Sequence, residues 1–338
     1  MPYPNITTSF STLVDGQDRY RASHVNAVQT AITSIITAMA HKQQLVVVAK
    51  ARGDYATLAL AVAAITDASA IKPYSILLSP GIYETSEVTL PDYVSLVGLD
   101  RNSCILQATT AGTRYVLRTG TNSALAKMTI SNECDAQSGI AYTIDTNGKA
   151  GVIIDNCQIT NIPTNPSATS YAFYQNGTAI VYNTSFTVTI TGGTTGIHVV
   201  GGATLILRGC DITVTGSGPF ASLALALAPT SNSYVYDSIL RVYQDYCILL
   251  SNGINNAVFE NCLIEGLDNN AYCAFLQGDG AKFFGCTMRA HGTAADCIGV
   301  SGSPTASIAH CRMNLASPLH ANLTNLIATP YNVSDTDV

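Results

Sequence analysis

The chain has 338 residues, of which 47% are hydrophobic and only 11% are charged, and its formal net charge is −6 at pH 7. So much apolar material and so little charge exclude a disordered chain and supply a continuous core. The acidic balance, without any basic run, argues against nucleic acid as a partner. No apolar stretch approaches the roughly 18 residues of a membrane helix, and the N-terminus lacks the basic and apolar regions of a signal peptide. We therefore expect neither membrane insertion nor secretion by a cleaved signal.

The first predicted element is a helix over about residues 23–41, with Ser23 as its candidate N-cap. Its apolar residues recur at alternating spacings of three and four, which makes a heptad seam of Val25, Val28, Ile32, Ile35 and Met39. β-Branched residues at both seam positions favour three strands in a coiled coil. The sequence therefore predicts a trimerisation segment at residues 1–44, with an amphipathic helix packed on its own domain as the alternative.

A second, shorter helix is predicted within residues 45–70. Residues 53–58 lead into an alanine-rich amphipathic stretch that runs through Ile65. We expect this helix to cap the repeat structure that follows over residues 71–315.

A repeat of about 26 residues follows the capping helix. Segments of the form apolar-x-polar-Cys-x-apolar recur, as in residues 154–159 and 259–264. The cysteine slot returns at intervals of 24 to 29 residues and is filled by Cys104, Met128, Cys157, Thr184, Cys210, Ser238, Cys262, Cys286 and Cys311. Apolar and polar residues alternate around it, which is the period of a half-buried strand. This repeat length predicts about nine stacked coils of a β-solenoid, since a propeller blade needs roughly 40 residues or more.

The cysteines are predicted to be reduced core residues. A second ladder of Cys247, Cys273 and Cys297 has spacings of 26 and 24, and no Cys-x-x-Cys occurs. Side chains in equivalent slots stack about 4.8 Å apart and run parallel, which disfavours disulfides. The Asn or Gly that precedes most first-ladder slots suits a tight bend with positive φ. Metal ligation is the less favoured alternative, and we expect neither a metal nor a cofactor.

The start of the repeat carries a recognisable pattern. A capping helix is followed by Pro80-Gly81-Ile82-Tyr83 and then by a Val-x-Leu-Pro…Val-x-Leu-x-Gly coil over residues 88–98. This order resembles the pectin-lyase-like superfamily, which includes pectate lyases, pectin methylesterases and phage tailspikes. The resemblance implies an all-β, right-handed, single-stranded parallel β-helix over residues 71–315, closed by a C-terminal cap or tail at 316–338.

One stretch, residues 270–286, is similar to the pectin methylesterases in particular. The family's catalytic pattern is not retained: its first active-site Gln falls on Asn270, its Gln-Asp pair on Gly292-Thr293, and its second catalytic Asp near Asn314. Without a carboxylate pair there is neither nucleophile nor general acid. The calcium-binding aspartates of a pectate lyase are likewise not visible as a stacked set. We therefore lean against an enzyme but leave the question open.

The N-terminal sequence is similar to the N-terminal regions of phage tail-fibre and tailspike proteins. The similarity lies in Leu13-Val14-Asp15-Gly16 and in Ala22-Ser23-His24-Val25-Asn26. The resemblance implies that residues 1–44 attach the chain to other virion proteins. It also implies a homotrimer located in the virion and assembled in the host cytoplasm.

A candidate binding surface follows from the second cysteine ladder. Since its cysteines point inward, the preceding Tyr246 and Tyr272 must point outward, one coil apart. Aromatic faces with flanking carboxylates suit sugar rings, so we predict a carbohydrate-binding site at Tyr246, Tyr272, Asp245, Asp268 and Asp296. The alternative is that surface tyrosines simply favour sheet packing.

A charged column is expected beside the first ladder. Arg241, Glu265 and Arg289 each lie three residues after a slot on successive coils. We interpret them as an exposed structural ladder worth little energy per pair, with a glycan contact as the alternative.

Three functions remain open. The favoured one is a trimeric phage tailspike or fibre that binds a host surface polysaccharide. The second is an active depolymerase of the same architecture, a glycosidase or lyase, for which a carboxylate pair at roughly 5–9.5 Å would be diagnostic. The third is a purely structural virion protein, such as a capsid decoration or tail component.

Overall fold

A computed structural model of the chain describes residues 44–85, 87–110, 113–133, 140–162, 169–190, 194–216, 222–268, 271–291, 297–301, 304–313, 325–328 and 333–334. Contacts divide the chain into two units, Met1–Leu45 and Val46–Val338. The predicted heptad helix and its five seam residues lie outside the described residues.

The capping helix is present as α2 (Leu58–Ala64). Thr57 is its N-cap, and its hydroxyl accepts a hydrogen bond from Leu60 N at 3.3 Å, which satisfies one donor of the first turn. Leu58 and Ala61 face the core and are buried. The sequence did not predict the strand that precedes this helix, which opens the first sheet.

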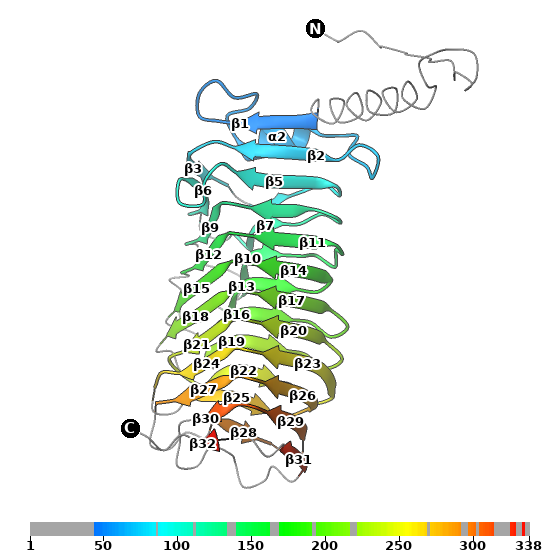
Figure 1. Ribbon diagram of the computed structural model, residues 1–338. Coiled ribbons are helices and arrows are strands. Elements are labelled where there is room, and N and C mark those ends of the chain that lie inside the picture. The colour runs from blue at the N-terminus through cyan, green and yellow to red at the C-terminus, as the bar shows by residue number, and fades with distance from the viewer. Residues whose placement is uncertain are drawn as a thin grey trace, which may run out of the picture. The chain divides into compact units, whose positions relative to one another are not determined.

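Three parallel sheets run the length of the second unit as far as the structure describes it (Figure 1). The 12-stranded sheet contains β1 (Leu45–Val48), β2 (Tyr74–Leu78), β5 (Val94–Gly98), β8 (Ala124–Ala126), β11 (Val152–Asp155), β14 (Thr178–Tyr182), β17 (Thr204–Arg208), β20 (Asn232–Tyr236), β23 (Ile254–Glu260), β26 (Asp279–Phe284), β29 (Thr305–Ala309) and β31 (Asn325–Ala328). The 11-stranded sheet contains β3 (Gly81–Glu84), β6 (Cys104–Ala108), β9 (Thr129–Asn132), β12 (Gln158–Asn161), β15 (Ser185–Ile190), β18 (Asp211–Gly216), β21 (Ile239–Val242), β24 (Leu263–Gly266), β27 (Thr287–Ala290), β30 (Arg312–Met313) and β32 (Val333–Ser334). The 9-stranded sheet contains β4 (Val88–Thr89), β7 (Tyr115–Arg118), β10 (Ile140–Asp145), β13 (Thr169–Gln175), β16 (Thr194–Val199), β19 (Ser222–Leu227), β22 (Tyr246–Leu250), β25 (Tyr272–Leu276) and β28 (Ile298–Val300).

Each coil visits the 12-stranded, the 11-stranded and the 9-stranded sheet in that order, as β11, β12 and β13 do. The predicted repeat register is confirmed. Residues that directly follow the cysteine slot pair from coil to coil, for example Gln158 with Thr129 on one side and Ser185 on the other. All nine slot residues are at most 2% exposed. The fold is the predicted all-β parallel β-helix of about nine coils.

The bend before eight of the nine slots explains the Asn and Gly found there. Positive φ recurs on eight successive coils, at Lys127, Asn156, Asn183, Gly209, Asp237, Asn261, Gly285 and His310. Neighbouring bends also touch, because the Asn261 side-chain amide donates to Asp237 Oδ1 at 3.4 Å. Asn and Gly tolerate this left-handed conformation best, so the pattern reflects a backbone requirement.

Both cysteine ladders lie in the core. Nine free cysteines are described and all are buried, while Cys134 lies outside the described residues. Burial raises the pKa of Cys157 to about 12 and that of Cys210 to about 11. These thiols are therefore protonated at neutral pH and act as small apolar side chains.

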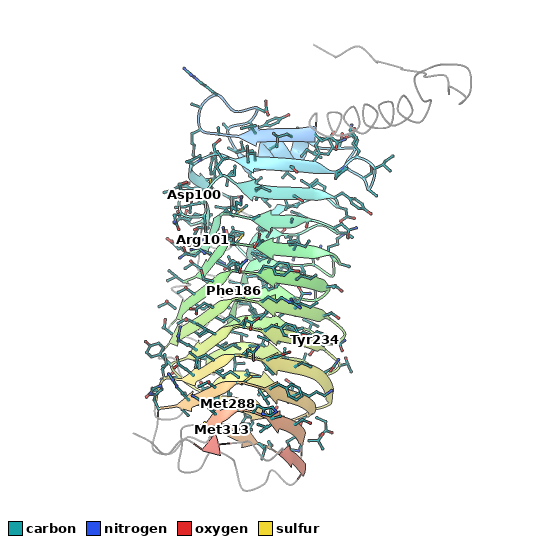
Figure 2. All side chains as sticks on the ribbon, in the orientation of Figure 1. Asp100, Arg101, Phe186, Tyr234, Met288 and Met313 are labelled. Atoms are coloured by element: carbon teal, nitrogen blue, oxygen red, sulfur yellow. The ribbon has the colours of Figure 1, made fainter. Side chains whose placement is uncertain are left out.

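Aromatic stacking supports the core between coils. Phe259 and Phe283 stack with ring centroids 5.0 Å apart, and Phe173 and Phe186 at 6.2 Å. Phe186 lies within the column of coils, whereas Tyr234 lies at its edge (Figure 2). Such pairs add packing energy beyond the area they bury.

The last strands extend the stack. β31 pairs with β29, and β32 pairs with β30. Stacking thus continues beyond residue 315, where the sequence places the end of the repeat.

Candidate functional site

The predicted tyrosine pair lies on the outer face of the 9-stranded sheet. Tyr246 and Tyr272 pair in register on β22 and β25, with ring centroids 5.5 Å apart. Phe275 completes this group, because its ring stacks on Tyr246 at 4.6 Å. All three side chains are half-buried. We call Tyr246, Tyr272 and Phe275 the C-terminal patch.

The three predicted carboxylates do not form one set around it. Asp245 has positive φ and accepts a hydrogen bond from Ser222 N at 2.9 Å through Oδ2, so its carboxylate holds the start of β19. Asp268 is exposed, and its carbonyl accepts from Ala271 N. Asp296 lies outside the described residues.

A second aromatic group on the same face was missed by sequence reasoning. Tyr142 stacks on Tyr171 at 5.6 Å, and Tyr174 stacks on His198 at 5.6 Å with the rings nearly parallel. Further contacts of 4.8 to 5.6 Å join these two pairs. We call Tyr142, Tyr171, Tyr174 and His198 the N-terminal patch. The sequence repeat could have identified this group. In its register Tyr142, Tyr171 and Tyr174 each directly precede a residue that faces inward, so their side chains face outward.

The two patches belong to the same outward columns. Paired residues run along the sheet in the order Tyr115, Tyr142, Tyr171, Thr195, Leu223, Tyr246 and Tyr272. A second column runs beside it, through Arg118, Asp145, Tyr174, His198, Ala226, Leu249, Phe275 and Gly299. Tyr171 and Tyr246 are three rungs apart, or roughly 14 Å at the usual strand spacing. The patches are therefore two ends of one strip, joined by Thr195, Leu223, Ala226 and Leu249. The first three of these side chains are at most 8% exposed, so the strip presents its surface mainly at the two patches.

Burial keeps the strip uncharged at neutral pH. It raises the pKa of Tyr142, Tyr171, Tyr174 and Tyr246. It lowers the pKa of His198, which favours the neutral ring. The hydroxyl and imidazole groups thus remain able both to donate and to accept hydrogen bonds.

One ion pair closes the N-terminal end of the strip. Arg118 Nε contacts Asp145 Oδ2 at 2.8 Å, and the guanidinium lies 4.0 Å from the centroid of the Tyr115 ring. Asp145 also accepts from Asn147 N at 2.7 Å. The carboxylate is 6% exposed and is held by both donors, so it serves as a fixed structural anion.

The predicted charged column lies on a different face. Arg241, Glu265 and Arg289 pair in register on the 11-stranded sheet. Glu265 accepts from Arg241 Nε at 2.8 Å and lies 3.4 Å from Arg289 Nη1. Glu265 is only 8% exposed, so the expectation of an exposed ladder is wrong at its central residue. The two arginines flank this carboxylate and satisfy it.

Two other features lie away from the strip. A cleft of about 500 Å³ near the capping helix is lined by Lys50, Ala56, Thr57, Ile82, Tyr83, Glu84 and Gln107. Among the described residues, no group of three or more His, Cys, Asp or Glu side chains could hold a metal ion, and no helix is long and apolar enough to cross a membrane.

Comparison with known proteins identifies the fold family. Residues 114–313 match the family described as the right-handed beta helix region. The chain belongs to this right-handed β-helix family. The predicted right-handed parallel β-helix is thereby confirmed.

Several solved structures are similar to this chain at low sequence identity. Pectin methylesterase from Aspergillus niger is 13% identical, with a TM-score of 0.49, and the match covers 87% of this chain and 92% of that one. Alginate lyase from Paenibacillus sp. is 16% identical, with a TM-score of 0.49 and coverage of 82% and 96%. The A-module of a mannuronan C-5 epimerase from Azotobacter vinelandii is 14% identical, with a TM-score of 0.46 and coverage of 76% and 81%. No curated protein sequence matches the chain. The pectin methylesterase positions considered above, Asn270, Gly292-Thr293 and Asn314, lie outside the described residues.

Proposed function

We propose that this β-helix binds a polysaccharide along the outer face of its 9-stranded sheet, as the receptor-binding part of a trimeric phage tailspike or fibre. The observation that carries the proposal is the register of the two aromatic patches, which share the same outward columns. Aromatic rings present apolar faces to the faces of sugar rings, and their hydroxyls reach the sugar's polar rim. The patches are roughly 14 Å apart, which is longer than one sugar, so a ligand that touches both patches is an oligomer or polymer.

Binding is favoured over cleavage by the carboxylates of this face. Across the nine strands as the structure describes them, Asp145 is the sole acidic residue, and Arg118 holds it. A glycosidase needs a second carboxylate within roughly 5–9.5 Å. The strands supply no second carboxylate among their described residues, and Asp245, which precedes Tyr246, accepts from Ser222 N. This face therefore suits binding better than cleavage.

The test measures binding of the purified protein to an array of bacterial surface polysaccharides. We expect Tyr246→Ala and Tyr272→Ala each to weaken binding by about 1–3 kcal/mol, because each removes a central aromatic contact. Tyr236→Ala is the matched control, since Tyr236 is also half-buried and outward-facing but lies on the 12-stranded sheet. Equal binding by all three variants would remove this face from consideration and favour the structural virion role.

The trimer is a separate part of the proposal and rests on the heptad seam. Each coil buries its own core against its neighbours, so the β-helix need not wait for the helices to associate. We expect Val28→Asp combined with Ile32→Asp to give monomers in sedimentation, with the β-sheet circular dichroism unchanged. A trimer that survives both changes would show that the seam does not hold the chains together.

A further inference from the structure

The charges around the aromatic strip identify the class of its ligand. We infer that the polysaccharide is uncharged, with its rings held by stacking and its hydroxyls by neutral hydrogen-bonding groups. The inference rests on the proposed function, because it concerns the ligand of the same face.

The strands themselves offer no free cation. Arg118 is the sole Lys or Arg on the nine strands as described, and its charge is compensated by Asp145 at 2.8 Å. It also stands at the N-terminal end of the strip, beside Tyr115. A polyanion lying across the two patches would therefore meet no unpaired positive charge from the sheet.

Arg114 is exposed and directly precedes β7, whereas the later segments that lead into these strands are acidic. Beyond residue 118, the connections from the 11-stranded to the 9-stranded sheet contain no Lys or Arg in the sequence, and their carboxylates are Glu133, Asp135, Asp245, Asp268 and Asp296. On the opposite side, Lys149 follows β10, and its Nζ lies 3.1 Å from Asp92 Oδ1. With a net charge of −6 as well, the sequence around the later strands carries more negative than positive charge, which disfavours an anionic polymer within a Debye length of about 10 Å.

The polar groups of the strip suit hydroxyl ligands. Tyr142, Tyr171, Tyr174 and Tyr246 carry hydroxyls that both donate and accept. His198 lies against two of these rings. Between the patches lie Leu223 and Ala226, which are apolar and only 8% and 4% exposed. Flat rings with hydroxyl rims, rather than charged substituents, complement such a surface.

The experiment compares glycan classes at two salt concentrations. Wild-type protein is applied to an array of uncharged polymers (laminarin, galactomannan, dextran), polyanions (alginate, polygalacturonate) and a polycation (chitosan). We expect binding among the uncharged polymers that changes by less than about twofold between about 50 and about 500 mM NaCl, since screening acts only on charge. Binding confined to the polyanions or to chitosan, or binding that falls about tenfold with salt, would overturn the inference and leave the proposed function standing. Binding to none of these polymers and to none of the bacterial surface polysaccharides of the first array contradicts the proposed function itself.

A matched pair of variants gives a second, independent readout. Leu249 is half-buried in the second column, between the two patches. Leu249→Lys adds a cation there and Leu249→Gln adds a neutral polar group of similar length. For an uncharged ligand we expect the two variants to bind within about twofold of each other at low salt. Binding by Leu249→Lys that is fivefold tighter or more than by Leu249→Gln would show that the ligand is anionic.

Discussion

The outer faces of the 9-stranded and 11-stranded sheets are built on the same coils yet present different chemistry. On the 9-stranded sheet one outward column is mostly aromatic, and its tyrosines are Tyr115, Tyr142, Tyr171, Tyr246 and Tyr272. On the 11-stranded sheet the corresponding column begins with Gln107 and then changes from hydroxyls to charges. It contains Gln107, Ser131, Thr160, Thr187, Thr213, Arg241, Glu265 and Arg289. Inward, both faces share one apolar core. The repeat register thus determines which residues of successive coils are neighbours. The outward side chains can differ from one sheet to the other, and they carry the function.

The largest expected effect comes from the core that both faces share. Phe259 is fully buried and stacks on Phe283. Phe259→Ala should lower the free energy of unfolding by about 3–5 kcal/mol, because it leaves a cavity in a close-packed stack. Urea denaturation measures the change, and Val258→Ala, an outward neighbour on the same strand, should cost less than about 1.5 kcal/mol. Equal losses of unfolding free energy in the two variants would mean that the inward and outward side chains of this strand do not differ in burial.

The next effect separates the two faces by ligand binding. Tyr171→Ala should weaken polysaccharide binding by about 1–3 kcal/mol, since this ring contacts three others of the N-terminal patch. Thr187→Ala makes a comparable truncation on the 11-stranded sheet and should leave binding unchanged. Isothermal titration of both variants, with folding checked by circular dichroism, decides between the faces. A loss of binding in Thr187→Ala alone would place the site on the 11-stranded sheet and contradict the assignment.

Alkaline pH should weaken the shared core. Burial raises the pKa of Cys157 to about 12, whereas a thiol in the unfolded chain titrates at about 8.5. Between these values the folded state binds more protons than the unfolded state, so stability falls as pH rises, by about 1.4 kcal/mol per pH unit for each such thiol. The slope of unfolding free energy against pH should be smaller by this amount in Cys157→Ala. An unchanged slope would contradict burial of a protonated thiol.

The smallest expected effect belongs to the charged column. Glu265→Gln removes the charge shared by Arg241 and Arg289 but keeps a hydrogen-bonding side chain. Because the arginines are partly exposed, at 29% and 51%, we expect a loss of about 0.5–1 kcal/mol in stability and none in polysaccharide binding. Glu260→Gln, at an exposed position of the 12-stranded sheet, is the control. A loss of glycan binding in the first variant would revive the glycan-contact alternative for this column.

The sequence predicted the fold well because its strongest signals concern the backbone. The slot at Cys157 and its equivalents recur once per coil, and the residue before it needs positive φ, so both register and bend were visible. Tyr246 and Tyr272 followed from the same register. The N-terminal patch was overlooked because Tyr142 and Tyr171 precede no cysteine, although their register is the same.

The electrostatic details could not be predicted in this way. Asp245 serves as a partner for Ser222 N, and this pairing joins segments 23 residues apart whose spacing carries no motif. The burial of Glu265 likewise depends on the two arginines above and below it. Register predicts which residues are neighbours, but the exposed fraction of a side chain depends on the conformations of all of them.

The most direct test of the binding strip uses the absence of tryptophan from the chain. Tyr246→Trp places a single tryptophan in the C-terminal patch, and Tyr236→Trp places one on the 12-stranded sheet. Titration with a polysaccharide that binds the wild-type protein should shift or quench the emission of the first variant and leave that of the second unchanged. An unchanged emission at position 246, with a response at position 236, would contradict the assignment of the 9-stranded face.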